Sequence, residues 1–153
     1  MAISPALATL VGRWSGDNTV WLGPGTDPLR STATAQVSLE AEGQALGMRY
    51  AWAEGGKPQS GILLIVGDAT LSAWAGAWTD SWHYAHQLMD VRGTGGGNAV
   101  SVHGTYAAPP GPDWGWRLVL EPGDADRCTL RMFNRTPDGA EALAVEMRLT
   151  RHA

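Results

Sequence analysis

The chain has 153 residues, a length typical of one domain with a sizeable core. Its formal net charge of −4 and the absence of any Lys/Arg cluster exclude an extended surface for nucleic-acid phosphates. No run of about 20 apolar residues is present, so we expect no membrane span. The first residues lack the basic and apolar regions of a signal peptide. We therefore expect a single cytoplasmic domain over residues 1–153.

Two features of the composition bear on function. The chain has 8 Trp against 1 Phe, and Trp is common in ligand pockets and interfaces because it joins a large apolar ring to one N–H donor. The 20 Gly and 9 Pro indicate many turns between short strands. Cys128 is the single cysteine, which excludes an intrachain disulfide and a cysteine-based zinc site. We interpret it as a buried structural residue.

The first predicted element is a short helix over residues 4–11. Ser4 can cap it, Pro5 suits its first position, and Leu7, Leu10 and Val11 share one face. A helix of this length is unstable alone. We expect it to pack across one end of a barrel.

After Gly12 the apolar pattern changes to an alternation of period two, which predicts strands. Within 45–53, for example, Leu46, Met48, Tyr50 and Trp52 share one face. The run 62–66 is apolar on both faces, so we expect part of its outer face to be covered. Ten strands are predicted, at 13–21, 31–39, 45–53, 62–66, 70–78, 84–92, 99–107, 114–121, 127–134 and 142–150.

The connections between these strands predict the topology. Turn signals such as 54–57, 93–97 and 137–139 recur at short intervals. No helical stretch follows the start of the chain, so parallel crossovers are not expected. The sequence predicts an all-β, antiparallel, up-and-down β-barrel of about ten strands with a short N-terminal helix, of the calycin or lipocalin-like type. The segment Gly12-Arg13-Trp14 is typical of the first strand of such barrels.

Three segments carry a resemblance to a known family. They are Leu10-Val11-Gly12-Arg13-Trp14, Ala77-Trp78-Thr79-Asp80-Ser81-Trp82-His83 and Pro109-Pro110-Gly111-Pro112-Asp113-Trp114-Gly115-Trp116-Arg117. With them the chain resembles the bacterial DUF1579 family over nearly its whole length. The resemblance implies a calycin-like barrel, and the function of that family is unknown.

More distantly, the architecture is similar to that of fatty-acid-binding proteins and of nitrobindins, whose barrels hold haem. Residues 17–19 stand where the nitrobindin pattern has further glycines, and His152 is the only late histidine. We therefore expect no cofactor and keep haem as the alternative.

The segment 74–86 has more aromatic, acidic and histidine side chains close together than any other part of the chain. Trp74 and Trp78 share a strand face, and Asp80, Ser81 and His83 follow within four residues. Asp80 could orient His83 and raise its basicity, which is an arrangement found in catalytic and binding sites. Alternatively, Asp80 and Ser81 stabilise a turn by bonding backbone N–H groups.

The candidate ligand-binding residues extend to other strands that present large aromatic side chains. They are Trp52, Trp74, Trp78, Asp80, Ser81, Trp82, His83, Trp114 and Trp116. We expect the tryptophans to face inward and to line a cavity, because a ten-stranded barrel is wide. If the opposite faces point inward, Arg49 and Arg117 would instead hold a carboxylate, as in fatty-acid carriers.

Metal binding and covalent catalysis are not predicted. His83 and His86 lie on opposite faces of a strand, and a site from Asp80, His83 and His103 would need convergence across strands. Ser81 lacks the Gly-x-Ser-x-Gly elbow of a nucleophile.

Three functional hypotheses remain open. The first is a non-enzymatic binding protein with a Trp-rich cavity for an apolar or aromatic small molecule. The second is an enzyme that uses His83 for general acid–base chemistry, with Asp80 as its orienting group. The third is a partner-binding protein or homodimer with exposed tryptophans at its interface.

Overall fold

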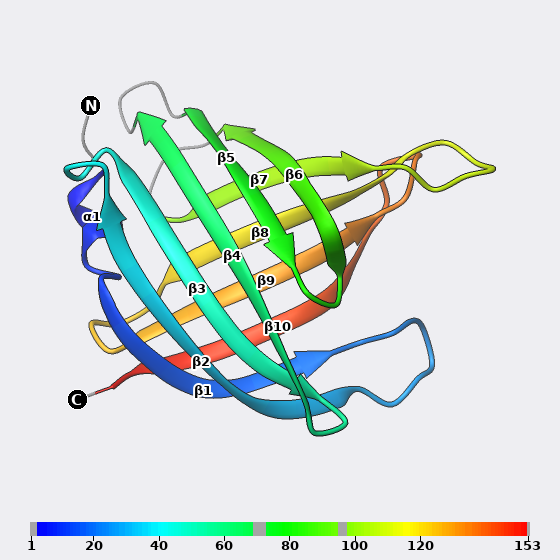
Figure 1. Cartoon of the computed structure of the whole chain (residues 1–153), viewed down its shortest axis with the longest axis horizontal. Helices are drawn as coiled ribbons and strands as arrows, with labels where there is room; N and C mark the ends of the chain where they lie inside the picture. The colour runs from blue at the N-terminus through cyan, green and yellow to red at the C-terminus, as the bar shows by residue number, and fades with distance from the viewer. Residues whose placement is uncertain (1–2, 69–72, 95–97, 153) are drawn as a thin grey trace.

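Ten antiparallel strands close into one barrel in the computed structural model, which describes residues 3–68, 73–94 and 98–152 (Figure 1). Each strand pairs with the next along the chain, and the first closes the barrel against the last. The predicted all-β, up-and-down architecture is confirmed. The elements are α1 (Pro5–Ala8), β1 (Gly12–Val20), β2 (Leu29–Glu40), β3 (Ala45–Glu54), β4 (Lys57–Asp68), β5 (Ala73–Asp80), β6 (Tyr84–Thr94), β7 (Val100–Tyr106), β8 (Trp114–Pro122), β9 (Arg127–Arg135) and β10 (Glu141–Arg151).

Most predicted strands fall within two residues of the observed ones, and the largest difference is in β4. Its apolar run 62–66 is preceded by five more strand residues that begin at Lys57. These residues include Pro58 and Gly61, which are poor predictors of a strand. The helix α1 is a single turn of four residues, within the one to two turns that the segment 4–11 predicts. Parts of the predicted strand 70–78 (residues 70–72) and turn 93–97 (residues 95–97) lie outside the described residues.

The outer face of β4 was expected to be covered in part. Its apolar side chains Ile62, Leu64 and Val66 are 41%, 42% and 46% exposed. The double-sided apolar pattern therefore does not report burial on both faces here. Within the run 62–66, the side chains that point into the barrel are those of Leu63 and Ile65, each 1% exposed.

Side chains alternate across the barrel wall as the period-two pattern requires. The inward-facing large aromatics were predicted correctly, since Trp52, Trp74, Trp78 and Trp116 all belong to the buried core. The alternative with interior arginines is wrong. Arg49 is exposed, and Arg117 is bonded to Glu141 in a partly exposed pair.

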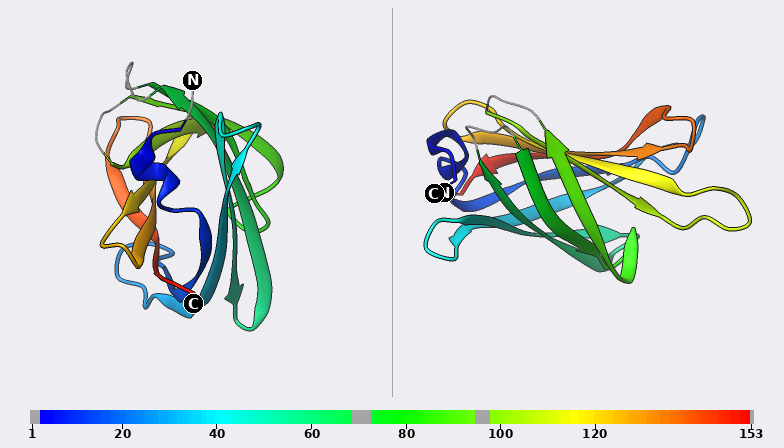
Figure 2. Two further views of the ribbon diagram at one scale, coloured as in Figure 1. Left: turned by 90° about the vertical axis from the view of Figure 1, so that its left-hand side faces the viewer. Right: turned by 90° about the horizontal axis from the view of Figure 1, so that it is seen from above.

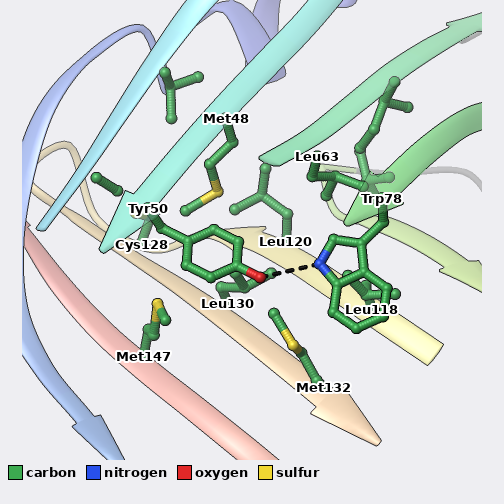
Figure 3. Packing of buried hydrophobic residues seen from close by; sticks show 14 of the residues in the cluster. Met48, Tyr50, Leu63, Trp78, Leu118, Leu120, Cys128, Leu130, Met132 and Met147 are labelled. Carbon is green, nitrogen blue, oxygen red and sulfur yellow. Dashed lines mark hydrogen bonds between the residues drawn. The ribbon is translucent and has the colours of Figure 1, made fainter. Parts of the chain in front are cut away.

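Apolar side chains from opposite walls project into the middle of the barrel (Figure 3). Thioethers and aliphatic groups from opposite walls meet around the rings of Tyr50 and Trp78. Met132, Met147 and Leu130 are 0% exposed.

The two ends of the barrel differ in what covers them (Figures 1 and 2). The helix end carries α1, the C-terminus and the connections β2–β3 and β8–β9. The opposite end, named the far end here, carries the connections β1–β2, β3–β4, β5–β6, β7–β8 and β9–β10.

Trp14 and Arg151 lock the helix end. The buried indole of Trp14 donates its N–H to the carbonyl of Leu10 at 2.8 Å. The guanidinium of Arg151 stacks on the Trp14 ring at 4.3 Å and donates to the carbonyls of Thr9 and Val11. Gly12 is required here because its φ is +141° and a Cβ would meet the Arg151 guanidinium at 2.7 Å. These contacts connect β1, β10 and the segment that follows α1.

Candidate functional site

Below the far end, a buried hydrogen bond joins β3 to β5 across β4. Tyr50, Gly61 and Asp80 are register partners on these three strands. The Tyr50 hydroxyl donates to Asp80 Oδ2 at 2.7 Å and accepts the indole N–H of Trp78 at 3.0 Å. The bond exists because Gly61 has no side chain, and a Cβ there would overlap the Tyr50 ring. Burial, followed by the negative charge of Asp80, raises the pKa of Tyr50 well above its usual value, so the hydroxyl keeps its proton.

The other oxygen of Asp80 holds the β5–β6 turn. Asp80 is 1% exposed, and its Oδ1 accepts the backbone N–H groups of Trp82 and His83, each at 2.8 Å. These are the bonds of an Asx turn. In the described part of the chain the carboxylate therefore contacts the backbone of His83 and is not hydrogen-bonded to its ring.

The anchored turn folds two aromatic side chains into the barrel mouth. The imidazole of His83 stacks on Trp52 with ring centroids 5.6 Å apart and meets the edges of Trp82 and Trp116 at 4.7 and 5.5 Å. Trp52 lies on β3 and Trp116 on β8, so the cluster spans the barrel. Trp116 also contacts Trp78, at 6.0 Å. Rings in contact at these separations form an aromatic plug, defined here as Trp52, Trp82, His83 and Trp116.

The plug contains polar atoms that lack partners. Trp52 Nε1 and His83 Nε2 are buried without a hydrogen bond among the described residues. Asn18, on the inner face of β1, is 1% exposed, and its Oδ1 also has no hydrogen-bond partner among the described residues. Buried groups of this kind are uncommon because each loses its bonds to water, and they often mark a place where water or a ligand binds.

Burial also sets the charge of His83. Loss of solvent lowers the pKa of the His83 imidazole below 6.5, and the nearby charge of Asp80 offsets only part of this. The ring is therefore neutral at neutral pH. A neutral imidazole presents one N–H donor and one acceptor nitrogen.

Beside the plug lies a pocket of about 740 Å³, named the mouth pocket. The β1–β2 connection forms one wall, with Trp21, Leu22 and Pro24, and the strand ends of β8 to β10 form the other, with Trp114 and Leu143. Its volume is within the range of small-molecule sites.

A hydrogen bond links the mouth pocket to the interior. Asn134, which lines the pocket, accepts the hydroxyl of Tyr106 at 2.9 Å. Asn134 is also the register partner of Trp116 in the plug. The pocket and the plug are thus adjacent parts of the far end.

The structure brings together six of the nine sequence-predicted residues at the far end and leaves Ser81 and Trp74 apart. Ser81 is exposed, and its hydroxyl donates to Gln59 and accepts the N–H of Ser60. Trp74 lies nearer the helix end, against Gly67. Trp52, Asp80, Trp82, His83, Trp114 and Trp116 lie at the far end, and Trp78 packs just beneath them.

The other histidines are on the outer surface. His86 and His103 are exposed, so His103 does not converge with buried Asp80. His152 is also exposed and lines a groove on the outer wall. The histidine that the nitrobindin comparison singles out therefore does not enter the barrel.

Sequence reasoning missed four residues of this region: Tyr50, Asn18, Asn134 and Trp21. Tyr50 was assigned to the inner face, but its bond to Asp80 depends on the register of three strands. Asn18 and Asn134 carry a signal that was available, because each is a polar residue at an inward position of a strand.

Comparisons with known proteins agree with this fold. The model of a family described as "Protein of unknown function (DUF1579)" matches residues 4–151. The structure is similar to the crystal structure of Rv2717c from M. tuberculosis, with a TM-score of 0.65 and 15% identity over 99% of each chain. No curated protein matches the sequence. None of the helices in the described ranges has the length and apolar character of a membrane span.

Proposed function

The chain belongs to the DUF1579 family, and on that premise we propose that it binds a small, mainly apolar or aromatic molecule at the far end of its barrel. The ligand occupies the mouth pocket against Trp114 and Leu143. Its polar group bonds to the unpartnered atoms of the plug. The fold supports this proposal, because calycin-type barrels enclose ligands at an open end.

The observation that carries the proposal is the coincidence of two features at one end. A pocket of about 740 Å³ is lined by Asn134, the register partner of Trp116 in the plug. Within the plug, the buried atoms Trp52 Nε1 and His83 Nε2 have no partner in the described residues. A ligand with one acceptor and one donor group satisfies both atoms. The neutral state of His83 suits an uncharged ligand.

Native mass spectrometry of freshly purified protein, compared with the denatured mass, tests the proposal. We expect a mass excess that disappears on denaturation. Trp114→Ala should lose most of this excess, whereas the control Leu88→Ala, at an outer position that is 70% exposed, should retain it. An excess retained equally by both variants would place the ligand elsewhere. An excess of haem size would support the cofactor alternative.

Acid–base catalysis is a second candidate, and one observation favours it. His83 is a neutral, buried imidazole whose Nε2 is unpartnered, as a general base requires. Asp80 would act by holding the backbone of the turn. Turnover of a bound compound that His83→Gln abolishes, without loss of binding, would favour catalysis over simple binding.

A further inference from the structure

A row of polar side chains crosses the outer wall of the barrel far from the mouth pocket. Pairing register places Arg13 on β1 beside Gln36 on β2, and Gln36 beside Arg49 on β3. Ile62 on β4 continues the row. Strands lie about 4.8 Å apart, so the Arg13 and Arg49 backbones are separated by about 10 Å. This is a distance over which two arginine side chains can converge on one anion.

The arginines of this row form no salt bridge with an acidic side chain in the described residues. The salt bridges of the described residues include neither Arg13 nor Arg49, and both arginines are exposed. The outer face of β8 to β10 is different, because there Arg131 pairs with Glu121 and Glu146. In a chain whose net charge is −4, two arginines without counter-charges on one face form a local positive site.

The row borders a groove of about 560 Å³. Small residues leave room in its wall, among them Ala51, Ser60 and Gly61, while Ile62 supplies apolar surface. His152 lines the groove as well, and its backbone N–H donates to the carbonyl of Arg13. The complete lining is Arg13, Trp14, Thr34, Ala35, Gln36, Arg49, Tyr50, Ala51, Ser60, Gly61, Ile62 and His152, which contains no Asp or Glu.

We propose that this outer groove across β1 to β4 is a second binding site, specific for a small organic anion. The acidic group, a carboxylate or a phosphate, binds between Arg13 and Arg49 with the Gln36 amide as a further donor. The apolar body of the ligand lies over Ala51 and Gly61 against Ile62. The groove shares no lining residue with the mouth pocket and does not depend on the function proposed there.

Titration calorimetry with phenyl phosphate, benzoate and neutral phenol tests the proposal. We expect at least one of the two anions to bind and phenol not to bind. The double variant Arg13→Gln/Arg49→Gln should weaken the affinity by at least about tenfold, because two charge-assisted hydrogen bonds are lost. Both side chains are exposed, so the fold should survive, which circular dichroism can confirm.

The matched control is Arg30→Gln/Arg127→Gln, which removes two other exposed arginines outside the groove. It should bind the anion as the wild type does. An equal loss in both double variants would show that net charge alone attracts the anion, and this would overturn the site. The site would also be overturned if neither anion binds, or if phenol binds as tightly as the anions. Binding of only one anion would identify the acidic group.

Discussion

The helix end and the far end of this barrel are built from the same strands but treat polar groups in opposite ways. At the helix end, the indole N–H of Trp14 reaches Leu10, and Arg151 bonds to Thr9 and Val11. At the far end, the buried atoms Trp52 Nε1 and His83 Nε2 have no partner among the described residues. Trp74 Nε1, nearer the helix end, is also unpartnered, but the adjacent residues 69–72 lie outside the described part of the chain.

The contrast between paired polar groups at the helix end and unpartnered ones at the far end indicates how one barrel can combine stability with binding. A buried polar atom without a partner costs about 1–3 kcal/mol, and a protein tolerates this cost where a ligand recovers it. We therefore expect changes at the helix end to affect stability without affecting binding at the far end. Changes at the far end should affect binding as well.

The largest effect is expected from Trp14→Ala at the helix end. Trp14 is 2% exposed and supports the stacked Arg151, so its loss should lower the free energy of unfolding by about 3–5 kcal/mol. Urea denaturation measures this. Trp82→Ala, at a half-buried position of the plug, should cost much less and should alter ligand retention. The comparison of the two ends fails if Trp82→Ala is the more destabilising change.

Asp80→Asn should have the next largest effect. The carboxylate accepts three hydrogen bonds, from Tyr50, Trp82 and His83, and its neutral replacement should cost about 2–3 kcal/mol. The control is Asp90→Asn, at an exposed position paired with Arg92, for which the change should stay within about 0.5 kcal/mol. Equal values for the two variants would contradict the anchoring role of Asp80.

Acidification should lower the stability of the folded protein through protonation of His83. Its pKa is lowered in the folded protein, so below the unfolded value of 6.5 the unfolded chain binds more protons than the folded chain. Stability is therefore complete above about pH 6.5 and falls as the pH drops through the folded pKa. Urea midpoints at pH 7.5 and 5.5 measure the decline. His83→Gln should make it shallower, and an unchanged slope in that variant would assign the decline to other groups.

The smallest effect is expected from a thiol reagent on Cys128. The thiol is buried on β9, and burial raises its pKa to about 12, so almost no thiolate is present at neutral pH. A disulfide reagent such as DTNB should label the unfolded protein fully and the native protein only at the rate of unfolding. Rapid labelling of the native protein would show that this part of the interior is open.

The sequence predicted the barrel well because its evidence is local. Alternating strands such as 45–53 and turns such as Gly55-Gly56 each report on their own segment. The inward position of Trp52 and Trp116 followed from the same alternation.

The far end could be predicted only in part. The segment around Asp80 and His83 was correctly identified as a place where aromatic and polar groups gather, but the partners were not. Tyr50 reaches Asp80 over Gly61 because three strands share one register, and no single segment encodes that register. The outer groove was missed for the same reason, since Arg13 and Arg49 are neighbours only after the strands pair.

The most direct test of the account compares the two ends during ligand binding. The indole N–H signals of the eight tryptophans can be followed by NMR while a panel of small, neutral aromatic molecules is titrated. We expect some members to bind and the signals of Trp52, Trp82, Trp114 and Trp116 to shift. The signal of Trp14 should stay in place. A panel without any binder, or shifts centred on Trp14, would contradict a binding site at the far end.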